Sequence, residues 1–222
     1  MTPRQLAAIA VATIAAAALS LFAAADPGRK TWTFDSDRVD APPSHFALAR
    51  TGGGAPGRWV VRHEAGAPSG GNVLAQVDAD DTSSRFPLAV AIEPSLQDLR
   101  LSVKCKAVSG KIDRACGLVF RYRDENNYYV ARANALEDNV RLYRVVDGER
   151  RQFAGERLVV APKVWHELRL DARGSTFSVW LDGKLLFTAE DSTFQEPGKV
   201  GLWTKSDSVT WFDGLRFAEL AP

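Results

Sequence analysis

Residues 117–143 contain most of the candidate residues for binding a polar ligand. Three runs alternate aromatic or β-branched residues with polar ones, and two polar clusters separate them, which is typical of strands joined by turns. Because side chains two positions apart share a strand face, Arg121 and Arg123 should lie together. The opposite face should carry Leu118, Phe120 and Tyr122. A face with several arginines suits a polar ligand, and a solvated outer face is the alternative.

The candidate ligand-binding residues combine hydrogen-bond donors with aromatic rings. Arg, Asn and Lys side chains donate to sugar hydroxyls, and aromatic rings stack on the apolar faces of pyranose rings. The residues expected in one cleft are Gln76, Arg85, Arg121, Arg132, Asn134, Arg141, Tyr143, Trp203 and Lys205. Alternation leaves the faces of Arg132 and Arg141 open, because each shares its parity with aromatic or apolar neighbours. For Trp203, packing in the core is the alternative to ligand contact.

Carboxylates decide whether the same face could cleave a glycosidic bond, since glycoside hydrolysis usually needs two of them flanking that bond. No Glu in this chain is followed two residues later by Asp. Glu137, next to Asp138, is the remaining catalytic candidate, because it lies in the turn between two of the strands above. Arg132 and Arg141 would keep it ionised, which suits a base or nucleophile better than a general acid. Turn formation alone is the alternative for both acids.

Metal-binding patterns are weak in this chain. The histidines His45, His63 and His166 are far apart and lack ligand spacing. Two groups of aspartates, within residues 35–40 and 78–81, could hold Ca²⁺ through carboxylate oxygens or be solvated turns. No P-loop or dinucleotide-binding fingerprint occurs. We therefore expect no required cofactor, with Ca²⁺ as the ion that the chain could use.

The N-terminal segment, residues 1–25, has the features of a secretory signal peptide. Arg4 is its only charge, an Ala-rich apolar run follows, and small residues precede Asp26. A retained anchor is the alternative, because the run is long enough to span a bilayer. We expect cleavage after Ala25 and export to a periplasm or beyond, with no membrane attachment of the mature protein.

Two cysteines, Cys105 and Cys116, flank a stretch that resembles a hairpin tip. With a two-residue turn at Gly110 and Lys111, they would face each other across the hairpin at a separation that a disulfide spans. Export to an oxidising compartment favours the bond, and two buried thiols are the alternative. We expect a structural disulfide, since no nearby histidine indicates redox or metal chemistry.

The composition is that of an ordinary globular protein. The formal net charge is +1, from 28 basic and 27 acidic residues, and no run of Lys and Arg occurs, which argues against nucleic-acid binding. Residues 26–222 are a normal length for one domain. Their apolar segments lack helical periodicity. We expect a single, monomeric, all-β domain.

Strand-like segments separated by Gly, Pro, Asp and Asn turns follow one another along the mature chain, which predicts an antiparallel β-sandwich or barrel. Asp182 and Gly183 form a two-residue hairpin signal. The expected strands are residues 32–34, 46–49, 58–63, 72–77, 86–92, 99–107, 117–123, 127–134, 140–146, 165–172, 176–181, 184–189, 199–204 and 209–217. Two sheets of six or seven strands each would account for the length of the mature chain.

The order of several motifs is similar to that of the concanavalin A-like lectin/glucanase superfamily. The motifs are Gly-Leu-Val-Phe-Arg (117–121), Asn-Tyr-Tyr-Val (127–130), Arg-Ala-Asn-Ala-Leu-Glu-Asp-Asn-Val-Arg-Leu-Tyr (132–143), Trp-His-Glu-Leu-Arg (165–169), Asp-Gly-Lys (182–184) and Gly-Lys-Val-Gly-Leu-Trp-Thr-Lys (198–205). The chain most resembles the bacterial exported branch described as 3-keto-disaccharide hydrolase-like, or LamG-like.

The resemblance implies a jelly roll in which a concave and a convex antiparallel sheet pack face to face. Members often bind sugars on the concave sheet, and some bind Ca²⁺. Laminarinase-type members carry Glu-x-Asp-x-Glu or Glu-x-Asp-x-x-Glu on one strand, and this chain lacks both patterns. The same fold serves several functions, so the resemblance alone does not assign one.

We therefore expect an exported jelly-roll domain that binds a carbohydrate ligand on its concave sheet. The first alternative is a glycoside hydrolase acting on a 3-keto disaccharide or related glycan. There Glu137 alone could start an elimination as a base, because a ketone acidifies the adjacent C–H and cations could hold the enolate. The second alternative is a structural or interaction domain without a small ligand.

Overall fold

The computed structural model describes residues 28–221, so the expected signal peptide, residues 1–25, lies outside the described residues. The described chain forms strands and no helix. No helix in this part of the chain has the length and apolar character needed to cross a membrane. The strands are β1 (Arg29–Trp32), β2 (Phe46–Gly52), β3 (Trp59–His63), β4 (Asn72–Gln76), β5 (Arg85–Leu96), β6 (Leu99–Ser109), β7 (Ala115–Asp124), β8 (Asn127–Asn134), β9 (Asn139–Val146), β10 (Glu149–Arg157), β11 (His166–Arg173), β12 (Thr176–Leu181), β13 (Lys184–Glu190), β14 (Gly198–Trp203) and β15 (Val209–Glu219).

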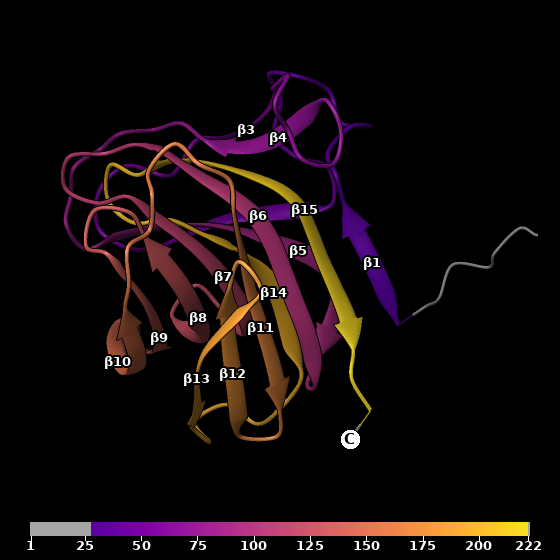
Figure 1. The fold of residues 1–222 in the computed structure, drawn as a ribbon, viewed down its shortest axis with the longest axis vertical. Helices are drawn as coiled ribbons and strands as arrows, with labels where there is room; N and C mark the ends of the chain where they lie inside the picture. The colour runs from indigo at the N-terminus through magenta and orange to yellow at the C-terminus, as the bar shows by residue number, and fades with distance from the viewer. Residues whose placement is uncertain (1–27, 222) are drawn as a thin grey trace, which may run out of the picture.

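The strands form two antiparallel sheets that pack face to face (Figure 1). The β6 sheet has the order β13-β12-β11-β6-β15-β4-β3, and β1 is added beside β15. The β8 sheet has the order β10-β9-β8-β7-β14-β5-β2. Hairpins build the outer parts of each sheet, whereas β6 to β7 and β14 to β15 pass from one sheet to the other. This confirms the expected jelly-roll sandwich, with eight and seven strands.

The core between the sheets follows from period-two alternation. In β6, Leu99, Leu101, Val103 and Cys105 all face this core, as their spacing predicts. Leu168 and Leu170 of β11 face the same space. Fully burying an aliphatic side chain contributes about 1.5–3 kcal/mol. These alternating strands therefore hold the two layers together.

A second apolar cluster lies on the other face of the β8 sheet. We call it the outer cluster, and its buried members are Phe86, Leu88, Val90, Ala115, Val119, Tyr128, Val130, Tyr143, Val145 and Trp203. Their neighbours in sequence, such as Leu118, Ala131 and Leu142, belong to the core between the sheets. Because successive side chains of a strand point to opposite faces, the outer cluster covers the face turned away from the β6 sheet.

Arg150 shows that this outer face is concave. It belongs to β10, and five strand spacings of about 4.8 Å, roughly 24 Å along the sheet, separate β10 from β5. Its guanidinium carbon nevertheless lies 4.8 Å from the ring centre of Phe86 on β5. It also lies 5.5 Å from the ring of Trp203 and 4.3 Å from that of Tyr143. The β8 sheet must therefore curl until side chains from distant strands meet over its concave face.

A β-bulge in β7 changes the faces expected from simple alternation. The register between β7 and β8 shifts between Phe120 and Asp124, and Arg121 has a left-handed backbone with φ of 47°. Leu118 and Phe120 face the core, whereas Tyr122 packs against the outer cluster. The expectation that these three share a face is therefore wrong, because an extra residue in one strand reverses the alternation that follows it.

Two Asp-Gly dipeptides form tight hairpins. Asp182 and Gly183 have φ of 50° and 80°, which is the backbone of a type I′ turn between β12 and β13. Asp147 and Gly148 have nearly the same angles, 50° and 82°, and join β9 to β10. The expected strands omit β10, because Glu-Arg-Arg-Gln-Phe-Ala-Gly-Glu-Arg has no apolar alternation. The Asp147–Gly148 dipeptide directly before β10 was the feature of the sequence that indicated a hairpin and hence a further strand.

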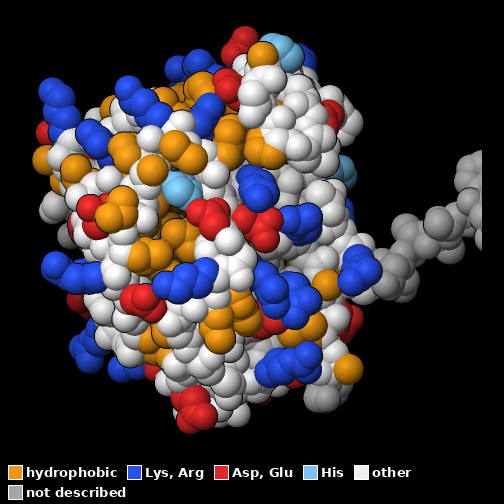
Figure 2. Space-filling view, in the orientation of Figure 1, with side chains coloured by type: hydrophobic (Ala, Val, Ile, Leu, Met, Phe, Trp, Pro, Cys, Tyr) orange, Lys and Arg blue, Asp and Glu red, His pale blue; other side chains and the backbone are white. Residues whose placement is uncertain are grey.

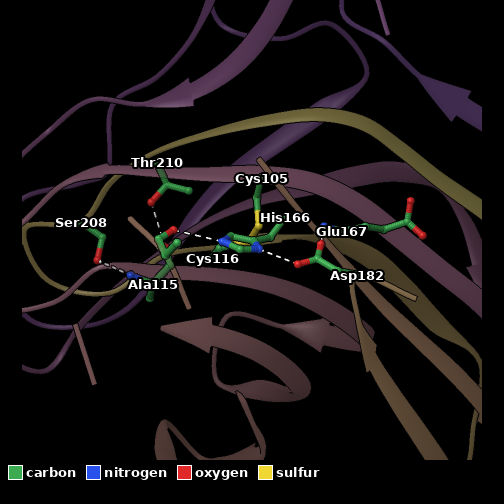
Figure 3. Close-up of a disulfide and its surroundings, with 9 residues drawn as sticks. Cys105, Ala115, Cys116, His166, Glu167, Asp182, Ser208 and Thr210 are labelled. Carbon is green, nitrogen blue, oxygen red and sulfur yellow. Dashed lines mark hydrogen bonds and ion pairs between the residues drawn. A yellow bond between two sulfur atoms is a disulfide. The ribbon is translucent and has the colours of Figure 1, made fainter. Parts of the chain in front are cut away.

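The expected disulfide between Cys105 and Cys116 is present, with the two Cα atoms 6.3 Å apart (Figure 3). The expected hairpin is wrong, because Cys105 lies on β6 and Cys116 on β7, in different sheets. The bond therefore links the two layers. Thr210 of β15 donates to the carbonyl of Ala115 at 2.8 Å, and Ser208 accepts from the amide of Ala115 at 3.0 Å. These bonds add polar links at the same end of the sandwich.

Replacing Cys105 and Cys116 by alanine should lower the free energy of unfolding by about 2–3 kcal/mol, since an 11-residue separation restricts the unfolded chain moderately. Urea unfolding of the oxidised wild type and the double variant measures this change. Intact-mass analysis under non-reducing conditions should first confirm that the wild type lacks free thiols. Equal unfolding midpoints would contradict a stabilising link between the sheets.

Trp203→Ala should destabilise the fold by about 3–5 kcal/mol, as expected for emptying a fully buried Trp site. Trp203 is completely buried, and its ring stacks on Phe86 with centres 5.4 Å apart. The matched control is Trp211→Ala, since Trp211 is only partly buried on β15 and should cost less. Thermal and urea unfolding provide the comparison, and a Trp203→Ala loss no greater than the control's would contradict this assignment.

Candidate functional site

A row of residues crosses four adjacent strands near one end of the concave face. Strand register pairs Trp203 of β14 with Gly117 of β7, Gly117 with Arg132 of β8, and Arg132 with Arg141 of β9. A Cβ on Gly117 would lie 3.0 Å from the Cβ of Trp203 and 3.1 Å from its ring. Glycine at this position therefore leaves room for the indole beside the polar residues.

Glu137 lies at the open edge of this row, in the turn between β8 and β9. Its Oε2 accepts a hydrogen bond from Arg132 Nη2 at 2.7 Å and lies 3.6 Å from Arg141 Nη1. Asn139 Nδ2 donates to the same oxygen at 3.2 Å. Burial raises the pKa of Glu137, but Arg132 and Asn139 outweigh that effect and lower it to about 2. Glu137 is therefore a carboxylate at neutral pH.

Arg132 is the buried partner that holds the Glu137 carboxylate in place. It is only 1% exposed. Besides its bond to Glu137, its Nη2 donates to the hydroxyl of Tyr143 at 2.9 Å. Its Nε and Nη1 are buried and have no hydrogen-bond partner among the described residues. Burial lowers its pKa, but the neighbouring Tyr143 and Glu137 raise it overall, so Arg132 is a cation.

A second group of charged residues joins the first through Asn134. Asn134 Nδ2 donates to Asp113 Oδ1 at 2.9 Å, and Lys205 Nζ donates to Asp113 Oδ2 at 2.7 Å. Asn134 Oδ1 accepts from the amides of Leu136 and Glu137, at 2.8 and 3.0 Å. Asp113 is fully buried, whereas the Lys205 side chain keeps 16% of its exposure. The turn that carries Glu137 and the Lys205 amine are thus fixed to one buried carboxylate.

Arg150 completes this site, although it is absent from the residues proposed on sequence alone. The guanidinium of Arg150 has no hydrogen bond or ion pair among residues 28–221. Its guanidinium is held against the rings of Phe86, Tyr143 and Trp203. Burial lowers its pKa. The signal that could have identified it is the Asp147–Gly148 hairpin, since that turn places Arg150 opposite Val145 of the outer cluster.

Six of the ten residues proposed from the sequence lie together in the structure: Arg132, Asn134, Glu137, Arg141, Tyr143 and Lys205. We call the following six side chains the polar cluster: Asp113, Arg132, Glu137, Arg141, Arg150 and Lys205. Asn134 and Tyr143 hydrogen-bond to its members. Trp203 lies beneath it and is fully buried. Packing in the protein interior, the alternative to ligand contact, is therefore the role of Trp203. Arg132 and Arg141, whose faces alternation left open, both lie with the cluster.

Gln76, Arg85 and Arg121 are fully buried, and their bonds go mainly to loop carbonyls. Arg85 donates to Ser206 O at 2.7 Å and Ala55 O at 2.7 Å. Gln76 donates to Ser208 O at 2.8 Å. These two therefore support the segment after Lys205 from inside. Arg121 donates to the carbonyls of Phe194, Gln97 and Gly174, and it does not join the polar cluster.

No group of three or more His, Cys, Asp or Glu side chains in residues 28–221 has a metal-binding arrangement. Two of the aspartates proposed for Ca²⁺ accept hydrogen bonds from backbone amides. Asp35 accepts from the amides of Gly71 and Asn72, at 2.9 and 3.0 Å. Asp80 accepts from the amides of Ala55 and Thr82, at 2.7 and 2.9 Å. These carboxylates therefore stabilise turns.

No family model matches this chain. Levanase from Bacillus subtilis (strain 168) is 32% identical over 89 residues, which are 40% of this chain and 13% of levanase. The chain thus matches only a small part of the length of that enzyme, and the match does not assign a family.

Two solved structures share the fold over most of this chain. The carbohydrate binding module CBM66 from Bacillus subtilis is 22% identical, with a TM-score of 0.61 over 79% of this chain and 98% of the module. The Bacillus licheniformis β-glucanase is 12% identical, with a TM-score of 0.57 over 87% of this chain and 99% of the enzyme. The chain therefore has the concanavalin A-like jelly-roll fold that its motifs indicate.

Proposed function

We propose that this protein is an exported module that binds a glycan through the polar cluster at one end of the concave face. One observation carries the proposal: charged side chains reach solvent there while buried partners hold them in place. Side-chain exposure is 34% for Glu137, 29% for Arg141 and 16% for Lys205. Arg132 and Asp113, which fix Glu137 and Lys205, are 1% and 0% exposed. Such fixed donors and acceptors suit sugar hydroxyls, since preorganised groups lose little freedom on binding.

The comparisons support the same class of ligand. One structural neighbour is named a carbohydrate binding module, and the matched segment of levanase belongs to an enzyme named for a polysaccharide. Export is supported by the disulfide, because such bonds persist in oxidising compartments. We propose that the mature protein acts as a monomer without a cofactor.

A hydrolase has less support from the geometry. Glu137 is too acidic to donate a proton at neutral pH, and a carboxylate with a pKa of about 2 is a weak base. The other acid of the polar cluster, Asp113, is fully buried and paired with Lys205. Conventional hydrolysis would therefore lack its acid. A base-initiated elimination from a 3-keto disaccharide is the enzymatic alternative that needs only Glu137.

Arg141→Ala should weaken glycan binding about tenfold or more, because hydrogen bonds to charged groups contribute about 1.5–3 kcal/mol. The melting temperature should change little, since exposed ion pairs contribute under about 1 kcal/mol. A glycan array on the wild type would choose the ligand, and calorimetry would compare the variant with Arg62→Ala, an exposed arginine on β3. Equal binding by both variants would exclude Arg141 from the site, and an array without signal would reject the proposed function.

Purified wild type should turn over neither ordinary nor 3-keto disaccharides, since a binding module needs no reaction. Chromatography of the sugars after long incubation checks this. If the keto substrate is consumed and Glu137→Gln stops the reaction, elimination with Glu137 as base replaces the binding function. Consumption that survives Glu137→Gln would place the catalytic group elsewhere.

A further inference from the structure

We propose that the glycan carries a carboxylate, as in a uronic acid, and that Arg150 with the neighbouring Arg132 and Arg141 selects for it. This inference rests on the proposed function, because it specifies the ligand of the same site. Its basis is the charge of the polar cluster and the guanidinium nitrogens that the protein leaves without partners.

The polar cluster carries more positive than negative charge. Arg132, Arg141, Arg150 and Lys205 are its four cations, and Glu137 and Asp113 are its two anions, which leaves a net charge of +2. Glu137 is neutralised by Arg132 at 2.7 Å, and Asp113 by Lys205 at 2.7 Å. A carboxylate brought by a ligand would supply part of the missing negative charge.

Arg150 is the cation most in need of a partner. Its guanidinium lies over three aromatic rings. The ring faces attract the positive charge, but they do not replace a hydrogen-bond acceptor. Its Nη1 is buried with no hydrogen-bond partner among the described residues. A buried guanidinium nitrogen without an acceptor is unfavourable. A bound anion would relieve that cost.

Arg132 provides the second, independent observation. It is 1% exposed, yet its Nε and Nη1 find no acceptor within residues 28–221. Burial and repulsion by Arg132 both lower the pKa of Arg150. Two neighbouring cations with free donors are the arrangement that a shared anion stabilises.

Among residues 28–221, Arg132 and Arg150 are the two arginines with buried side-chain nitrogens that lack a hydrogen-bond partner, and arginines paired with carboxylates elsewhere show the contrast. On the outer face of the β6 sheet, blue and red side chains lie side by side (Figure 2). There Arg100 pairs with Asp171 at 2.6 Å, and Arg216 with Glu167 at 2.8 Å. The planar guanidinium presents paired donors that match the two oxygens of a carboxylate. We therefore favour a carboxylate over a sulfate ester.

The test compares ligands of equal length by calorimetry: trigalacturonate, its fully methyl-esterified form, a sulfated neutral trisaccharide and a levan trisaccharide. Trigalacturonate should bind about tenfold or more tighter than its methyl ester, since esterification removes the charge that the arginines would contact and leaves the sugar rings unchanged. Equal binding of acid and ester would overturn the inference while leaving glycan binding intact. Tighter binding of the sulfated sugar would overturn the choice of carboxylate, and no binding of any glycan would overturn the proposed function too.

Variants identify the residue responsible. Arg150→Met keeps an apolar side chain over the rings and should remove about tenfold or more of the preference for acid over ester. Arg150→Lys keeps the charge without the paired donors and should fall between the wild type and Arg150→Met. The matched control is Arg123→Met, because Arg123 also lies over a ring, at 4.9 Å from Phe194, but outside the site. An unchanged preference in a folded Arg150→Met protein would exclude Arg150 from the selection.

Discussion

The concave face of the β8 sheet must be shielded from water, and this requirement shapes the rest of the molecule. The face carries the outer cluster, whose large side chains Trp203, Tyr128 and Leu88 are fully buried. Layers usually bury such a face against another element, but here the sheet curls and Arg150 closes over the rings. The centre of the concavity is therefore filled. The end with Glu137, Arg141 and Lys205 keeps charged side chains partly exposed, which is where we propose that a ligand binds.

Three fully buried arginines show how similar residues acquire different roles. Arg85 and Arg121 lie inside the protein, and backbone carbonyls accept most of their bonds. Arg132 instead meets a carboxylate and a phenol, and two of its nitrogens stay unpaired. A buried charge is tolerated only when its surroundings satisfy it. Arg85 and Arg121 are therefore structural. Arg132 keeps two nitrogens that could donate hydrogen bonds to the proposed ligand.

The sequence predicted the layers better than it predicted the site. Alternation located thirteen of the strands, β2 to β9 and β11 to β15, and the inward face of β6, because burial on one side produces that period directly. The strand expected at residues 32–34 overlaps β1 only at Trp32. It failed where one residue breaks the period, as at the bulge of Arg121, and where an edge strand lacks apolar alternation, as in β10. Arg85, Arg121 and Arg132 were grouped as one set because residue type does not reveal which acceptors the fold supplies. Asp113 and Arg150 were missed, since several of their partners, such as Lys205 for Asp113 and Phe86 for Arg150, are far away in sequence.

The disulfide has a consequence beyond holding the two layers together. The covalent ring that it closes runs from Cys105 to Cys116 and includes Asp113, the carboxylate on which Lys205 and Asn134 depend. Closing this ring restricts the chain segment that holds Asp113, and with it the proposed ligand donors, once the thiols are oxidised. If these donors bind a sugar as proposed, association would need little reorganisation of the backbone. Oxidative maturation would in this way set the rigidity of the recognition surface before any sugar arrives.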